Sequence, residues 1–350
     1  MQPATIHPQL PIPAHFIPEK VSQVWRVPYQ ARAEEARAWA KTNQLQPSAQ
    51  DQFNLSLVLV DVQNTFCIPD FELFVGGRSG KGAVEDNIRL SQFIYHNLGA
   101  ITSILLTLDT HQATQIFHPI FLVNEKGENP PPYTLIHAED IRSGHWKFNP
   151  SLAEDVGVTA AYGQEMLVYY TTQLAKNDRF DLTIWPYHAM LGGIGHALVS
   201  AIEEAVFFHT IARYSGPEFE IKGTSPFTEY YSALGPEILE GPQGERIAEK
   251  SSKILSRLRK SDAMVITGQA KSHCVAWTIK DLLEQIQQTD PAQVGKVYLL
   301  EDCSSPVVVP GAIDYTDQAD LDFARFASAG MHVVRSTDPI PTWPGIIFRQ

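Results

Sequence analysis

The sequence is poor in cysteine, in basic charge and in long apolar runs. Its 350 residues include three cysteines and no CxxC pair, which disfavours a secreted disulfide scaffold and predicts a cytoplasmic location. Lys and Arg number 27 against 39 Asp and Glu, a formal net charge of −12. That charge argues against nucleic acid and anionic membrane surfaces as partners. We find no run of 18 apolar residues and no signal-peptide pattern, so no membrane partner is expected.

The residues that are present indicate a globular α/β chain. Hydrophobic residues make up 44% and charged residues 19%, enough to build a core. Continuous apolar runs, such as LSLVLVD, are typical of parallel strands buried on both faces. Such runs lie at 55–61, 102–109, 205–211, 263–268, 296–302 and 331–336. Helices are expected between several of them, at 84–98, 195–204, 245–260, 274–287 and 317–329. This alternation predicts a three-layer, doubly wound, mostly parallel sheet with helices on both faces.

Two segments lie outside this regular pattern. Residues 1–50 form a predicted N-terminal extension, in which early prolines oppose regular structure and 31–41 favours a short helix. That helix either packs on the core or a neighbouring subunit, or belongs to a loosely held arm. The remaining domain, 51–350, carries a predicted insertion at about 112–180, where loops of such sheets often build sites.

Cys274 is the sharpest chemical signal, because it stands between the strand at 263–268 and the helix at 274–287. Backbone N–H groups and the dipole at a helix N-terminus lower a thiol pKa and favour thiolate. The same N–H groups can hold an oxyanion beside the sulfur. A small buried hydrophobe is an equally open interpretation.

Acidic and imidazole side chains follow other strands. Asp61 ends the first strand and could cap a turn, bind a metal or act as a base. Asp109 and His111 are two residues apart after the second strand, so in extended backbone they point the same way. Carboxylate with imidazole suits Zn, Fe or Mn, and His188 offers a third ligand. Further candidates are His118 and His196. For any single histidine, a satisfied surface or core position is the ordinary alternative.

Taken in order, LVLVDVQNTF, LLTLDTH, IWPYH, EIKG and ITGQAKSHCV resemble the isochorismatase-like cysteine hydrolases, within them the nicotinamidase branch. The resemblance covers about residues 55–340. It implies a catalytic triad of Asp61, Lys222 and Cys274, although Lys222 would not be chosen from its own sequence context.

The resemblance also implies a divalent metal, Zn, Fe or Mn, held by Asp109, His111 and His188. Many nicotinamidases add a histidine six residues after D-x-H, but here that position is Phe117, and His118 follows it.

Further positions implied by the resemblance surround the nucleophile. An oxyanion hole would use the backbone N–H groups of Ala270 and Cys274, with a cis bond between Gln269 and Ala270. The family's substrate pocket is matched here by Phe66, Trp185 and His273.

The activity implied is deamidation of nicotinamide to nicotinate and ammonia through a Cys thioester, a reaction of NAD metabolism. One alternative is another small amide, a ureido compound or an isochorismate-type vinyl ether. A second is a non-catalytic family member that binds a partner. Members of the family commonly form dimers or tetramers, so a homo-oligomer is expected. The N-terminal extension, the insertion and a lengthened approach to Lys222 at 209–221 could reshape substrate choice.

Overall fold

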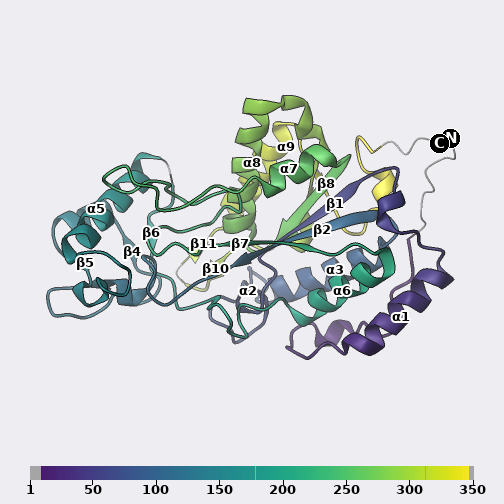
Figure 1. Cartoon of the computed structure of the whole chain (residues 1–350), viewed down its shortest axis with the longest axis horizontal. Coiled ribbons are helices and arrows are strands. Elements are labelled where there is room, and N and C mark those ends of the chain that lie inside the picture. Colours follow the sequence, from purple (N-terminus) through teal and green to yellow (C-terminus); the bar gives the residue numbers. More distant parts are fainter. Residues whose placement is uncertain (1–8, 178, 312, 347–350) are drawn as a thin grey trace.

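The computed structural model describes residues 9–177, 179–311 and 313–346. Its centre is a six-stranded sheet in the order β12-β9-β8-β1-β2-β7, in which every neighbouring pair is parallel (Figure 1). The strands are β1 (Leu55–Val60), β2 (Ile101–Asp109), β7 (Glu218–Lys222), β8 (Ala263–Gly268), β9 (Val297–Leu300) and β12 (His332–Val334). The chain runs outward from β1 to β7, then returns to β8 on the other side of β1. The carboxyl ends of β1 and β8 therefore flank the switch point, where sheets of this type bind ligands.

Helices cover both faces of the sheet, which confirms the predicted three-layer α/β class (Figure 1). Alternate strand residues feed two separate cores, because successive side chains of a strand point to opposite faces. Val58 and Val60 belong to one core, and Leu57 and Leu59 to the other. The first core includes residues of α7 (Lys253–Lys260), α8 (Ala276–Thr289) and α9 (Thr316–Ser328). The second includes residues of α3 (Gly82–His96) and α6 (Ser200–Arg213).

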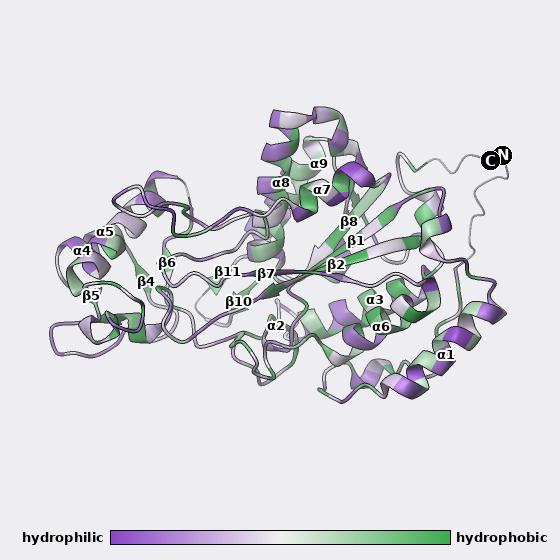
Figure 2. Cartoon of the chain, viewed as in Figure 1, coloured by the Kyte–Doolittle hydropathy of each residue, from purple (hydrophilic) through white to green (hydrophobic). Residues whose placement is uncertain are grey.

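The N-terminal segment packs on the core as an outer layer. It contains α1 (Tyr29–Thr42), which includes the predicted helix at 31–41 and lies against α6. Arg32 pairs with Glu204 at 2.8 Å, and both side chains are largely buried. In Figure 2, α1 is mostly purple and white, whereas α3 and α6 carry more green. Of the alternatives for this segment, the structure therefore shows the one packed on the core.

Short elements between residues 122 and 183 form a lobe beside the sheet, at the left of Figure 1, and most of them fall in the predicted insertion at 112–180. They are β3 (Leu122–Val123), β4 (Leu135–Ile136), α4 (Ala138–Arg142), β5 (Lys147–Phe148), α5 (Ala160–Lys176) and β6 (Leu182–Thr183). The other short elements are α2 (Asn64–Cys67), β10 (Val308–Val309) and β11 (Ile313–Asp314). The division at residue 50 stays a prediction.

Three secondary-structure predictions need correction. The strand predicted at 205–211 is wrong, because this run lies inside α6. Its apolar residues serve two sides of the helix: Phe208 packs against Tyr95 under the sheet, and Phe207 against Tyr29 of α1. The helix predicted at 195–204 begins only at Ser200, and the one at 245–260 occupies only α7. The strand β7 was not predicted. Over the described ranges, no helix combines the length and apolar character needed to cross a membrane.

Candidate active site

Three side chains from distant segments meet at the carboxyl edge of the sheet. Asp61 follows β1, Lys222 is the last residue of β7, and Cys274 lies in a π-helical turn (Lys271–Val275) after β8. Parallel strands place their carboxyl ends at one edge, which brings these segments together. All three side chains are buried.

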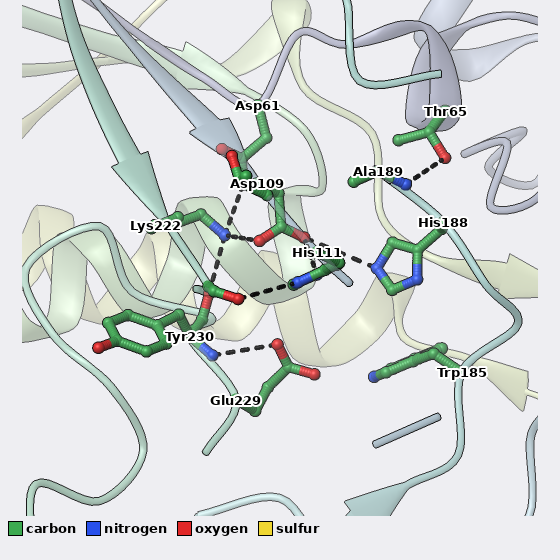
Figure 3. Close-up of polar contacts among 12 residues, drawn as sticks. Asp61, Thr65, Asp109, His111, Trp185, His188, Ala189, Lys222, Glu229 and Tyr230 are labelled. Atoms are coloured by element: carbon green, nitrogen blue, oxygen red, sulfur yellow. Dashed lines mark hydrogen bonds and ion pairs between the residues drawn. The ribbon is translucent and has the colours of Figure 1, made fainter. Parts of the chain in front are cut away.

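Lys222 is the centre of the cluster (Figure 3). Its Nζ lies 2.9 Å from Oδ2 of Asp61, 3.0 Å from Oδ1 of Asp109 and 3.5 Å from Sγ of Cys274. It also donates to the carbonyl oxygen of Tyr230 at 2.8 Å. Burial would lower the pKa of Lys222, but Asp109 and Asp61 outweigh it and raise the pKa well above its usual value. The ammonium is therefore charged.

Asp61 is held by neighbouring strands. Thr107 of β2 donates to its Oδ1 and accepts from its backbone N–H at 3.1 Å. Its φ is +47°, a left-handed conformation that turns the chain sharply out of β1. Burial raises the pKa of Asp61 although Lys222 opposes the shift. The carboxylate thus lies in a site where gaining a proton is made easier.

The Cys274 thiol differs from the sequence prediction in its proton affinity. Helix-terminal N–H groups were expected to lower its pKa, but burial raises it well above the usual value, and Asp61 and Asp109 add to the rise against Lys222. The expected lowering of the thiol pKa by the helix terminus is thus outweighed by burial, which favours a neutral thiol. A neutral thiol needs a base within reach, and Asp61 shares a hydrogen bond with it.

The segment before Cys274 is fixed from several sides. The Gln269–Ala270 peptide bond is cis, as the motif implies. The Gln269 side chain donates to Asp86 at 2.8 Å, and its backbone N–H donates to the carbonyl oxygen of Val60 at 2.8 Å. At Gly268 an added Cβ would lie 2.0 Å from that same carbonyl oxygen, so only glycine fits. Ala270 and Cys274 therefore sit in one tightly held turn.

Asp109, His111 and His188 form a second buried group beside the first. Oδ2 of Asp109 lies 2.8 Å from Nε2 of His111 and 3.6 Å from Nε2 of His188. The opposite nitrogens, Nδ1, donate to the carbonyl oxygens of Gly223 at 3.2 Å and Pro186 at 2.8 Å. These bonds orient both rings so that Nε2 faces the carboxylate. The potential ligand atoms all lie within 4.8 Å of one another.

Charge in this second group is shared between acid and bases. Burial would raise the pKa of Asp109, but His111 and Lys222 outweigh it and hold the pKa well below its usual value. Burial would lower the pKa of His111, but Asp109 raises it. Burial lowers the pKa of His188. The group therefore contains an ionised carboxylate and at least one imidazole that can serve as a neutral ligand.

The two other histidines differ in position. His118 is buried, and its ring centroid lies 5.8 Å from that of His111 and 5.7 Å from that of His188. Its Nδ1 donates to the carbonyl oxygen of Gln112, while its buried Nε2 has no hydrogen-bond partner within the described part of the chain. Burial lowers the pKa of His118 to about 3, so the ring is neutral. His196 bonds Thr110 through Nε2 at 2.8 Å instead.

Aromatic side chains lie beside these groups. The Trp185 and His273 rings are 5.9 Å apart, and Phe66 lies 5.7 Å from the His188 ring. Tyr231, which has no signal in the sequence, lies 5.5 Å from His273 and accepts a hydrogen bond from Nε1 of Trp185 at 3.2 Å. The residues predicted to bind substrate thus lie near the cluster, and their role stays a prediction.

Sequence reasoning missed several supporting residues. The Gln63 side chain donates to the Asp109 carbonyl oxygen and accepts from its N–H, each at 2.8 Å, so it extends the sheet ladder with a side chain. Gly223 has φ +83°, and an added Cβ would lie 2.7 Å from Cε1 of His111. Glu229 is buried next to the group of Asp109, His111 and His188, called the metal-type group below (Figure 3). In the sequence, Gln63 and Gly223 are marked only by their places in the motifs DVQNTF and IKG. No sequence motif marks Glu229.

No family model and no curated relative matches the chain. Solved structures do resemble it. An Acinetobacter baumanii nicotinamidase/pyrazinamidase shares 18% identity at a TM-score of 0.48, over 83% of this chain and 99% of that one. The yeast nicotinamidase bound to nicotinaldehyde shares 17% at 0.48, over 80% and 99%. A Pyrococcus horikoshii pyrazinamidase in complex with zinc shares 18% at 0.42, over 81% and 99%. The sequence motifs of this chain resemble the nicotinamidase branch. What its site can do chemically follows from the side chains whose distances and burial are given above.

Proposed function

We propose that the chain is a metal-containing cysteine amidohydrolase that converts nicotinamide to nicotinate and ammonia. One observation carries the proposal. A buried, charged ammonium lies 3.5 Å from the Cys274 sulfur and 2.9 Å from the Asp61 carboxylate. A thiol, a base and a fixed positive charge in contact are what a cysteine nucleophile requires.

In the proposed first step, Asp61 takes the proton of the Cys274 thiol, and Lys222 holds the thiolate by charge. The sulfur attacks the amide carbonyl carbon and forms a C–S bond. The backbone N–H groups of Ala270 and Cys274 would stabilise the oxyanion, a contribution of about 3–4 kcal/mol per donor. Asp61 then gives the proton to the amide nitrogen as the C–N bond breaks, and ammonia leaves a thioester.

In the second step, Asp61 takes a proton from water, whose oxygen attacks the thioester carbonyl carbon. The C–S bond breaks, the acid is released, and the proton returns to the sulfur. The raised pKa of Asp61 suits both halves, because one carboxyl group must accept and return a proton.

The residues of the second group fit a divalent metal. Asp109, His111 and His188 supply one carboxylate and two imidazoles, a donor set that suits Zn, Fe or Mn. The unpartnered Nε2 of His118 lies beside them, so we propose it as a further ligand or a hydrogen-bond partner of bound water. When bound, the ion would supply a Lewis-acid contact that orients a substrate ring nitrogen. In His111→Ala the metal content is expected to fall, and unchanged content would remove this site.

The substrate class follows from the aromatic surroundings. Trp185, His273 and Phe66 offer flat apolar surfaces for a ring, which favours an aromatic amide over an aliphatic one. A cytoplasmic location, a role in NAD metabolism and a homo-oligomeric state remain predictions.

The direct test is ammonia release from nicotinamide, pyrazinamide and simple aliphatic amides, with and without a chelator. We expect release from the aromatic amides, loss of at least 1,000-fold in Cys274→Ala (on the order of an abolished nucleophile), and little change in Cys303→Ala. Cys303 is also buried and, within the described part of the chain, makes no hydrogen bond with Asp61, Lys222 or Cys274, so it controls for removing a buried sulfur. Turnover that persists in Cys274→Ala rejects the proposal.

A further inference from the structure

A small cavity lies next to the metal-type group, away from the Cys274 sulfur. Its volume is about 10 Å³, which is room for roughly one water-sized molecule. Phe117 forms the shared wall, because it lines this cavity and its ring lies 4.7 Å from that of His111. The Tyr170 and Tyr231 side chains line it as well.

Two buried acids line this small space. Glu229 and Glu237 are each about 5% exposed. Oε1 of Glu229 accepts the Tyr230 backbone N–H at 3.0 Å. A third acid on the wall, Asp181, is half-exposed and pairs with His137 at 3.1 Å. The two glutamates therefore place strong acceptor oxygens around a space of molecular size.

Among the described residues, neither carboxyl oxygen of Glu237 has a partner at ordinary hydrogen-bond geometry, although the backbone N–H of Tyr231 lies near enough to lower its pKa. Its one ion pair is long, 3.5 Å to Arg179, which also pairs with Asp281 at 3.3 Å. A buried acid without hydrogen-bond partners is costly, so such an oxygen indicates a ligand or a bound proton. Burial raises the pKa of Glu237 to about 8. Without a ligand in the cavity, the carboxyl group therefore keeps its proton at neutral pH.

Glu237 also lines a second, outer cleft of about 430 Å³. Other acids of this cleft are Glu240, Asp281 and Glu284. Glu229 stands at the opposite, inner side, next to His111 (Figure 3). Glu237 therefore lines both the small cavity and the outer cleft, whose basic residues are Arg179 and Lys250, while Glu229 lines the small cavity on the side of His111.

We propose that the cavity between Glu229 and Glu237 binds ammonium, and that the nitrogen product leaves the active site through it. This inference rests on the proposed function, in which ammonia is released. Ammonium is about as large as water and donates four hydrogen bonds, which suits two acceptor carboxylates better than water does. The surrounding aromatic rings add cation–π attraction.

The proton balance is simple. Ammonia enters neutral, the O–H bond of Glu237 breaks, and the new N–H bond leaves an ammonium–carboxylate pair. The ammonium then passes to the outer cleft, and Glu237 regains a proton from water, whose O–H bond breaks and which leaves as hydroxide. No oxidant or further reactant is needed.

The first test measures binding without any substrate. The melting temperature of the protein is compared in ammonium, potassium and sodium chloride at equal ionic strength and pH 7. A ligand that binds only the folded state raises the melting temperature. We expect ammonium to raise it by about 2 °C or more over sodium. The rise should persist in Glu284→Gln, an exposed acid of the same cleft, and vanish in Glu237→Gln and Glu229→Gln.

Equal melting temperatures in ammonium and sodium would show that the cavity holds water only and overturn the proposal. A rise that survives in both Glu237→Gln and Glu229→Gln would overturn it as well. An equal rise in potassium would overturn the assignment to a hydrogen-bond donor.

A second test uses turnover. Added ammonium should inhibit amide hydrolysis by the wild type and by Glu284→Gln to the same extent. At the same ammonium concentration, Glu237→Gln should be inhibited at least several-fold less. The two tests separate the claims: a chain without amide hydrolysis contradicts the proposed function, while the melting experiment still decides whether the cavity binds ammonium.

Discussion

Replacing Glu237 by glutamine should flatten the pH dependence of stability. The Glu237 pKa is about 8 in the folded protein against an ordinary value of 4.5, and burial is its main cause. Between these pH values the folded state binds more protons than the unfolded chain, so the free energy of unfolding falls as pH rises. Each pKa unit corresponds to about 1.4 kcal/mol, so the raised pKa costs the wild type on the order of 5 kcal/mol by pH 8. Glutamine carries no such proton.

The groups that face Glu237 set the size of this effect. Arg179 lowers its pKa, whereas Glu229 and Asp281 raise it. Glu237 in turn raises the pKa of Tyr170 and of Tyr231. All five remain in the variant, so the difference between wild type and variant isolates the Glu237 proton.

The assay is urea unfolding at several pH values from 5 to 8, in buffer free of ammonium. Glu237→Gln and wild type should have similar stability near pH 5, and the variant should gain several kcal/mol on the wild type by pH 8. Glu284→Gln, an exposed acid of the same cleft, should follow the wild-type curve. Parallel curves for Glu237→Gln and wild type would contradict the raised pKa of Glu237, because they would mean that this acid is ionised in the folded protein throughout.

Three further predictions concern single contacts. Gly223→Ala should weaken metal binding by about tenfold or more, because the added Cβ would meet the His111 ring. Competition with a chelator measures this affinity. Gly244→Ala is the control, since Gly244 has a similar φ of +80° but open space around the added Cβ, and metal binding should not change. Thr107→Val removes the hydroxyl that donates to Asp61, the proposed base, so kcat should fall by about tenfold with KM and fold retained; an unchanged kcat would contradict this role. Arg32→Ala should cost about 3 kcal/mol of unfolding free energy by leaving a buried acid on α6 unpaired, while the exposed Arg37→Ala on the same helix should cost little.

The sequence predicted the strands correctly where an apolar run of residues matches a strand that is buried on both faces. The strands at 55–60, 101–109 and 263–268 are central, so both faces are apolar and the sequence shows it. The same signal misled at 205–211, because α6 is buried under the sheet on one side and under α1 on the other, which hides the helical period. The edge strand β7 leaves Phe219 and Ile221 exposed beside charged residues, so no apolar run marks it.

The site was predictable only in part. Asp61 and Cys274 stand at strand ends, where a sheet of this type places chemistry, and Lys222 entered through the family resemblance alone. Glu229 and Glu237 carry no local signal, since their burial depends on how a loop packs against α5 and α8. Burial of Cys274 itself raises its thiol pKa, contrary to the expected direction. Removal from water raises this pKa by more than a helix terminus lowers it.

If Cys274 is the nucleophile, its sulfur forms a covalent bond with the acyl group of the amide during turnover. The most direct measurement is intact-protein mass spectrometry after acid quenching during turnover of nicotinamide. We expect one added nicotinoyl group, localised by peptide mapping to Cys274 and absent in Cys274→Ala. Cys67 and Cys303 are the internal controls, since both are buried thiols that should stay unmodified. Steady turnover with Cys274 never acylated, or with the acyl group on another residue, would contradict it.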